Sequence, residues 1–168
     1  MTAEKRRASI LQQLRAASQP VSATALAKTF GVSRQIVVGD VALLRAAGTD
    51  ITATPRGYVL DQNPGGLIRQ AACCHTASDM ETELNIMVDN GCTVMDVVVD
   101  HPVYGQLTGA LHLKNRYDVQ QFILRSSKTR PLSLLTEGIH LHTLCCPDEA
   151  AFLRVCDSLR QAGYLLEG

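Results

Sequence analysis

The sequence predicts an α+β protein in which an N-terminal winged helix-turn-helix domain precedes a C-terminal ferredoxin-like domain. Three observations support this class. Helical periodicity and a short hairpin fill the first sixty residues, a stretch rich in turn-forming residues follows, and strand-like and helix-like segments then alternate to the end. In a chain of 168 residues this pattern gives two small domains, which we place at residues 1–61 and 67–168.

The N-terminal domain is expected to contain three helices. Apolar residues at helical spacing predict the first, which ends before Pro20. Ser22 and Ser33 stand where N-caps of the next two would lie, and Gly31 provides the turn between them. The expected helices cover residues 4–17, 23–30 and 34–47.

A small β-hairpin should follow the third helix. Residues 51–54 and 57–60 are β-like and are joined by Pro55-Arg56, a pattern typical of the wing in winged helices. The next residues, 61–66, carry only turn chemistry and are the best candidate for a linker.

The C-terminal domain is expected to follow a βαββαβ order with an extra helix at its end. This order is typical of the ferredoxin-like fold, in which the four strands of the domain, numbered along the chain, lie in the order 4-1-3-2. The predicted strands are 67–75, 93–101, 106–113 and 139–146, and the predicted helices are 79–90, 115–127 and 148–162.

Charge is unevenly divided although the formal net charge is zero. Residues 1–61 contain eight Lys or Arg and four acidic residues, whereas residues 62–168 contain eight and twelve. A basic domain beside an acidic one indicates that the first meets a polyanion. No apolar run approaches the ~20 residues that a membrane helix needs, and polar residues interrupt the N-terminus, so we expect a cytoplasmic protein without a signal peptide.

Six cysteines are present, and none belongs to a Cys-x-x-Cys pair. A zinc ribbon and a thioredoxin-type site are therefore not indicated. In the cytoplasm most of these thiols should be reduced and buried.

The second and third helices predict a DNA-reading element. Two short helices joined by a glycine-containing turn place the second helix in a major groove, where its first residues reach base edges. Those residues here are Ser33, Arg34 and Gln35. Arg pairs well with guanine and Gln with adenine, while Arg56 of the wing can reach the backbone or the minor groove. The alternative, a generic three-helix packing unit, leaves the Ser-Arg-Gln sequence and the wing unexplained.

Histidines at strand spacing predict a metal site in the second domain. His140 and His142 alternate with Leu141, so both imidazoles project from one face of a strand. His75 ends the first strand of the domain, which should lie beside the fourth, and Glu83 emerges at the same end of the sheet. His nitrogen and carboxylate oxygen suit Zn, Ni, Mn or Fe. For a lone histidine such as His112 we favour an ordinary polar role.

Several other side chains lie close to this site in the sequence. Glu81 precedes Glu83 on the same helix, and Cys73 should face the same side as His75 while Cys146 faces with His142. The cysteines are either soft metal ligands or, as we prefer, small packing residues.

The chain resembles the niacin-responsive repressors of NAD biosynthesis, which couple a winged helix to a three-histidine domain. The matching segments run in the same order over nearly the whole chain: VSRQIVVGDVALLRA, ATPRGYV, HPVYGQLTGAL and EGIHLHTL followed by Pro147-Asp148-Glu149. The HPVYGxLT and GxHLHTL motifs are quite specific, whereas the helix-turn-helix alone is not. The chain departs from the usual pattern at Gly39 and in the cysteines around His75.

The resemblance implies a DNA-binding homodimer with nicotinic acid as corepressor. It also implies a divalent metal, Ni or Zn, held at the positions that here are His75, Glu83, His140 and His142. His101, with Tyr104 of the same motif, is implied to lie at the effector. The partners are then operator DNA, nicotinic acid and a second copy of the chain, with no membrane.

Three other functions remain open at this level. In a metal-sensing regulator the ion itself would be the signal. In a metal-dependent enzyme the ion would activate water with Glu81 or Glu83 as base, but no nucleophile or phosphate-binding loop accompanies the site. A constitutive DNA-binding protein would use the metal for structure alone.

Overall fold

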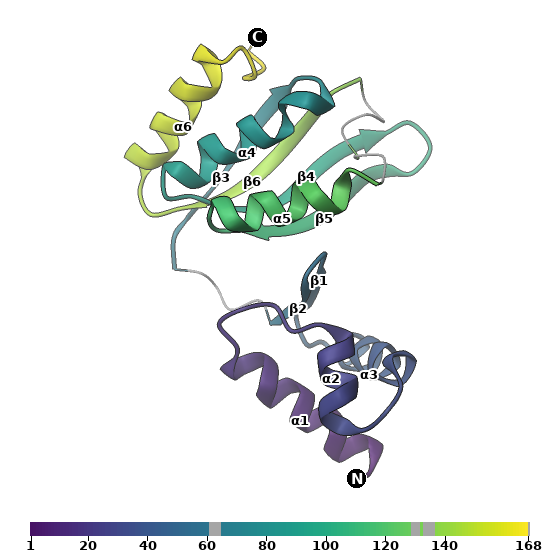
Figure 1. Ribbon diagram of the computed structural model, residues 1–168. Helices are drawn as coiled ribbons and strands as arrows, with labels where there is room; N and C mark the ends of the chain where they lie inside the picture. Colours follow the sequence, from purple (N-terminus) through teal and green to yellow (C-terminus); the bar gives the residue numbers. More distant parts are fainter. Residues whose placement is uncertain (61–64, 129–131, 133–136, 168) are drawn as a thin grey trace. The chain divides into compact units, whose positions relative to one another are not determined.

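The computed structural model describes residues 1–60, 65–128, 132 and 137–167. The chain divides into two compact units, Met1–Pro64 and Gly65–Gly168 (Figure 1). Residues 61–64 of the expected linker lie outside the described residues. Within the described ranges, no helix combines the length and apolar character needed to cross a membrane.

The N-terminal unit is a winged helix with the elements that the sequence predicts. Its helices pack around buried apolar side chains that include Ile10, Leu26 and Val37. A backbone bridge from Val21 to Tyr58 ties the segment before the second helix to the hairpin. The elements are α1 (Ala3–Ala16), α2 (Ala23–Phe30), α3 (Arg34–Ala46), β1 (Ile51–Thr54) and β2 (Gly57–Leu60).

Capping sets the turn between α2 and α3. The Ser22 and Ser33 side chains accept hydrogen bonds from the backbone N–H groups of Ala25 and Ile36, at 3.0 and 3.3 Å. Gly31 ends α2 with a left-handed φ of 63°, which other residues rarely adopt. Gly31 and the two serine caps therefore define a short turn between α2 and α3, as in a helix-turn-helix.

A buried ion pair joins α1 to α3. Asp40 is 4% exposed and accepts hydrogen bonds from Arg6, at 2.5 Å to Nε and 3.3 Å to Nη2. Arg7 lies 3.5 Å from the same carboxylate. The hydrogen bond from Arg6 raises the pKa of that guanidinium further above its ordinary value. These contacts fix the orientation of α3 against the rest of the unit.

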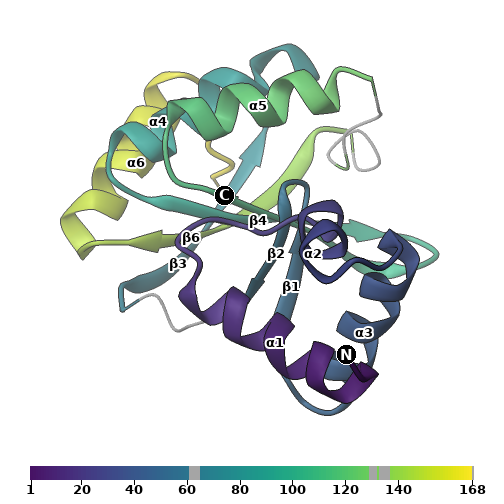
Figure 2. The same ribbon diagram turned by 60° about the horizontal axis from the view of Figure 1, so that its bottom comes forward.

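The C-terminal unit contains a four-stranded antiparallel sheet with its helices on one face (Figures 1 and 2). The strand order is β3-β6-β4-β5, and every pair is antiparallel. The elements are β3 (Leu67–Cys74), a 3₁₀ turn η1 (Ala77–Asp79), α4 (Met80–Asp89), β4 (Thr93–His101), β5 (Gly105–Leu113), α5 (Arg116–Ser126), β6 (Ile139–Cys146) and α6 (Glu149–Gln161).

The α+β class and the βαββαβ order with an added helix are confirmed, but the predicted strand order is wrong. In the expected 4-1-3-2 order the third strand, β5, would lie inside the sheet. Instead β6 and β4 are the inner strands, and β3 and β5 lie at the two edges. Burial explains the exchange, since β6 is buried at five of its eight positions, whereas Gln106 and Thr108 of β5 are exposed. A bulge opposite Met95 also suits β5 to an edge.

The C-terminal tail covers the other edge of the sheet. After α6, Leu165 forms an antiparallel bridge with Cys73. The Cys74 N–H donates to the Tyr164 carbonyl at 2.8 Å, and the Leu166 N–H donates to the Ala72 carbonyl at 2.9 Å. The tail therefore pairs with the outer edge of β3, and Tyr164 lies beside the end of that strand.

Candidate metal centre and nucleic-acid interface

Two paired strands bring the three predicted histidines together. In the β3–β6 register, Cys73 lies opposite His140 and Ala71 lies opposite His142. Because alternate residues share a face, both histidines point toward the helices. His75 follows β3 by one residue, and its ring centroid lies 4.8 Å from that of His140. The ring of His140 lies 4.9 Å from that of His142.

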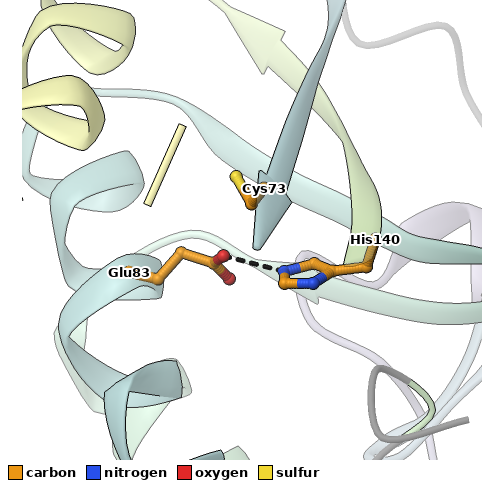
Figure 3. Close-up of side chains that lie close together, drawn as sticks. All are labelled: Cys73, Glu83 and His140. Carbon is orange, nitrogen blue, oxygen red and sulfur yellow. Dashed lines mark hydrogen bonds and ion pairs between the residues drawn. The ribbon is translucent and has the colours of Figure 1, made fainter. Parts of the chain in front are cut away.

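Glu83 supplies a carboxylate at the centre of this group. It projects from α4 toward β3 and β6 (Figure 3) and is fully buried. Its Oε1 lies 2.7 Å from His142 Nε2, and its Oε2 lies 2.8 Å from His140 Nε2. His75 Nε2 also contacts Oε2. One carboxylate therefore meets the Nε2 atoms of three imidazoles.

The opposite nitrogen of each ring is committed to the backbone. The Nδ1 atoms of His75, His140 and His142 contact the carbonyl oxygens of Thr76, Gly138 and Asp96, at 2.7, 2.8 and 2.7 Å. A carbonyl only accepts hydrogen bonds, so each Nδ1 carries the proton. Each neutral ring then directs the lone pair of Nε2 toward Glu83. Metal-binding histidines have the same arrangement, because their other ring N–H donates to a carbonyl or carboxylate and fixes the tautomer.

The centre of the cluster therefore consists of hydrogen-bond acceptors unless a cation or extra protons are present. Burial favours the neutral rings of His75 and His142, but the charge and hydrogen bonding of Glu83 outweigh it and raise the pKa of both. Burial likewise opposes ionisation of Glu83, yet the three imidazoles hold its pKa well below the ordinary value. The cluster thus attracts positive charge, carried by protons or by a metal ion.

The donor set fits a divalent transition metal. Three imidazole nitrogens and a carboxylate match the ligand types of zinc, nickel and related ions. Two donors about 2.0–2.1 Å from one ion and at right angles are about 2.9 Å apart, close to the nitrogen–oxygen separations found here. His75, Glu83, His140 and His142 are the residues that would hold such an ion.

Three residues that sequence reasoning missed position the histidines. Gly138 has a φ of 89°, and a Cβ there would lie 2.5 Å from the carbonyl oxygen of His75. Tyr164 of the tail packs its ring 5.2 Å from that of His75. Asp96 also contributes, since its carbonyl accepts from His142, and its signal in the sequence is an acid inside the apolar strand VMDVVV.

The other side chains considered near the cluster, those of Glu81, Cys73 and Cys146, lie in different environments. Glu81 is exposed, whereas Cys73 is fully buried, with its donor atom within 4.8 Å of those of Glu83 and His140. Burial and the Glu83 carboxylate raise the pKa of the Cys73 thiol. Cys146 lies four residues beyond His142 and contacts the thiol of Cys92 at 3.1 Å.

His101 and Tyr104 contact each other in the turn between β4 and β5. His101 Nδ1 accepts hydrogen bonds from the N–H groups of Val103 and Tyr104, at 3.1 and 3.2 Å. The two rings lie 5.0 Å apart, and Tyr104 is 76% exposed. In the described part of the chain, no hydrogen bond, ion pair or ring contact joins either residue to the histidine cluster. They share only its end of the sheet, because β4 runs parallel to β3.

The predicted DNA-reading residues lie on the surface of the N-terminal unit. Ser33, Arg34 and Gln35 are exposed at the start of α3. Gly39, one turn further on, is also exposed and has no neighbouring atom within 4 Å of an added Cβ. The N-terminus of α3 therefore presents charged and polar side chains. Gly39 leaves the exposed face in the middle of the helix without a side chain at that position.

Arg56 is placed in the wing but is only partly exposed. Its Nη1 donates to the side-chain oxygen of Gln19 at 3.3 Å. Asp40, a residue that sequence reasoning missed, anchors the buried side of α3. Its signal was its spacing, since it falls on the helix face shared by the apolar Val37, Val41 and Leu44.

Comparison with known proteins finds one family match in each part of the chain. Residues 68–168 match the 3H domain family, and residues 6–59 match an HTH domain family. The chain is 40% identical over 166 residues to a probable transcription repressor, NiaR, of Thermotoga maritima, covering 98% of this chain and 95% of that protein. It is 41% identical over 168 residues to the transcription repressor NadR of Bacillus subtilis, covering 96% and 93%.

A helix-turn-helix joined to a 3H domain defines a two-domain transcription regulator rather than an enzyme. Full-length similarity to two repressors narrows the class further. The chain belongs to the 3H-domain family of transcription repressors that includes NiaR and NadR, which confirms the resemblance inferred from its motifs.

Proposed function

We propose that this repressor controls genes of NAD biosynthesis or niacin uptake in the cytoplasm, with nicotinic acid as corepressor and a divalent metal in its 3H domain. The observation that supports the metal most directly is the convergence of three Nε2 atoms on the buried carboxylate of Glu83. Nicotinic acid follows from the likeness of HPVYGQLTGAL and EGIHLHTL to the niacin-responsive repressors.

Each part of the proposed site has a defined task. His75, Glu83, His140 and His142 hold the ion, which supplies positive charge that attracts a carboxylate. His101 and Tyr104 lie at the same end of the sheet, and Tyr104 offers an exposed aromatic face for a pyridine ring. Ser33, Arg34, Gln35 and Arg56 contact the operator, and a homodimer places two recognition helices on two half-sites.

The effector must favour one state of the repressor. A ligand that binds the DNA-competent state and the other state equally changes nothing, so the proposed corepressor must bind the first more tightly. A coupling of about 1–3 kcal/mol, roughly a 5–150-fold change in operator affinity, is typical of such regulators.

The proposal is tested by fluorescence anisotropy with labelled operator DNA and metal-loaded protein. Nicotinic acid should tighten operator binding, and nicotinamide, which lacks the carboxylate, should have little effect. The His140→Ala variant should lose both metal and the response to nicotinic acid. Unchanged metal content and an unchanged response in this variant would show that the site is wrongly assigned.

A metal-sensing regulator is the second candidate, and one observation favours it. Glu83, His140 and His142 are at most 3% exposed, so an ion among them is nearly enclosed by the protein. In that case operator affinity should change on chelation and remain constant when either pyridine compound is added with metal saturating. The same titration therefore distinguishes the two functions.

A further inference from the structure

We infer that Cys73 is a ligand of the metal as well, so that the site combines a thiolate with the imidazoles and the carboxylate. This inference rests on the proposed metal centre and deepens it. The donor atoms of Cys73, Glu83 and His140 all lie within 4.8 Å of one another (Figure 3), and all three residues are buried. In a tetrahedral zinc site, sulfur at about 2.3 Å and nitrogen at about 2.0–2.1 Å from the ion lie about 3.6 Å apart. Bringing donors that lie within 4.8 Å of one another to that separation takes a shift of about 1 Å.

The backbone directs the thiol into the cluster. Cys73 is the register partner of His140, so the two side chains project from adjacent strands on the same face of the sheet. The bridge from Cys73 to Leu165 pairs the other edge of β3 and holds this part of the strand in place. Cys74, the next residue, must point to the opposite face.

Charge balance favours a second anion among the ligands. Glu83 offsets one of the two charges of a divalent ion, and a thiolate offsets the other. An uncompensated charge in a site where Glu83 and Cys73 are fully buried is costly, whereas a neutral set of ion and ligands is not. Coordination releases the thiol proton to solvent, as happens whenever cysteine binds a metal.

A thiolate also narrows the metals that the site prefers. Imidazole and carboxylate ligands alone accept manganese and iron as well as zinc and nickel, but sulfur favours softer ions. The structure therefore points to zinc or another thiophilic ion over manganese. The simpler alternative is that Cys73 is a small core residue whose thiol only contacts Glu83.

Cobalt(II) distinguishes these alternatives in the full-length protein. Thiolate-bound cobalt shows an intense near-ultraviolet charge-transfer band, which sites of nitrogen and oxygen ligands lack. We expect the band in the wild type and in Cys74→Ser, the matched control on the opposite face of β3. Cys73→Ser should lose the band and bind cobalt more weakly, by more than the roughly 10–100-fold that loss of a hydrogen-bond partner of a ligand costs. His140→Ala should also lose it, which assigns the band to this cluster.

A measurement on the wild type guards against a variant that fails to fold. X-ray absorption of the zinc-loaded protein should show a sulfur neighbour at about 2.3 Å beside nitrogen and oxygen at about 2.0–2.1 Å. One bound equivalent of metal without a sulfur neighbour, or a cobalt band unchanged in Cys73→Ser, would overturn the role of Cys73 and leave the histidine–glutamate site intact. Failure of the wild type to bind metal at all would overturn both.

Discussion

The two units of the chain place their polar functional groups in opposite environments. In the N-terminal unit, Arg34 and Gln35 lie on the exposed face of α3 while Val37 and Val41 fill the core. In the C-terminal unit, Glu83 and His142 are themselves part of the core. Helical periodicity thus separates the proposed DNA-reading positions from the core of the first unit, whereas the proposed metal ligands of the second unit occupy core positions. Substitutions should therefore affect function alone in one unit and function together with stability in the other.

The largest effect is expected for Glu83→Gln. The amide keeps the shape of the side chain but removes the central charge, so metal affinity should fall by more than the roughly 10–100-fold that loss of a hydrogen-bond partner of a ligand costs. Metal content after dialysis measures this. Glu81→Gln, on the exposed side of the same helix, should retain the ion. Full metal content in Glu83→Gln would remove Glu83 from the ligand set.

Replacement of Arg34 should give the corresponding result in the other unit. Arg34→Ala removes a candidate base contact, which should lower operator affinity by about 1–3 kcal/mol. Because Arg34 is exposed, the free energy of unfolding should change by less than about 0.5 kcal/mol. Arg45→Ala, at the far end of α3, serves as the control for DNA binding. A large loss of stability in Arg34→Ala would contradict the separation of the two roles.

Gly138→Ala tests how closely the strands must approach at the candidate metal centre. The added Cβ would meet the carbonyl of His75 at 2.5 Å, whereas Gly163 has a similar left-handed φ of 79° and open space around it. Both variants carry the backbone strain, but only Gly138→Ala should also displace His75. We expect it to be less stable than Gly163→Ala by about 1–3 kcal/mol, measured by chemical denaturation. Equal effects would mean that the contact is unimportant.

The stability of the metal-free protein should depend on pH through the cluster. The pKa values of His75 and His142 are raised from 6.5, so their contribution is full below that pH and declines as pH rises through the folded-state pKa. The pKa of Glu83 is lowered from 4.5, so its contribution is full above that pH and is lost on further acidification. The cluster should therefore stabilise the metal-free fold most between pH 4.5 and pH 6.5.

Thermal unfolding in chelator, compared with Glu83→Gln, measures this dependence. The variant should lack the mildly acidic maximum. Metal-loaded protein should behave in the opposite way and gain stability toward neutral pH, because the ion needs neutral imidazoles. A metal-free profile identical in wild type and variant would count against coupling within the cluster.

The smallest effect is expected at Gly39. Its surroundings are open, so Gly39→Ala should stabilise the N-terminal unit by up to about 1 kcal/mol through helix propensity alone. The operator affinity of this variant reports whether the missing side chain at Gly39 matters for DNA contact. A decrease in the unfolding temperature would show that the glycine has a structural role in the unit.

The sequence predicted local features well and long-range pairing less well. Periodicity and caps located the helices and strands to within one or two residues, apart from the 3₁₀ turn at the start of the second unit's first helix. The placement of β6 inside the sheet depends on contacts distant in sequence, which periodicity does not encode. The histidines nevertheless met as predicted, because β3 and β6 are neighbours in both strand orders.

Parts of the site depended on relationships that no local motif reveals. The approach of Gly138 to the backbone of His75 arises only when β3 and the start of β6 lie side by side. The ion pair of Asp40 with Arg6 likewise spans thirty-four residues. Cys73 was a candidate ligand from strand alternation, but its position among buried donors required the fold.

The tail that closes the edge of β3 places a tyrosine where it would report binding of the proposed metal ion. The chain has no tryptophan and four tyrosines, so tyrosine emission is not masked. Tyr164 lies 5.2 Å from the ring of His75, well within the range over which an open-shell ion such as nickel or cobalt quenches a fluorophore. Zinc, with its filled d shell, leaves that emission unquenched. Occupancy of the proposed site and the kind of ion would therefore be followed in the unlabelled protein.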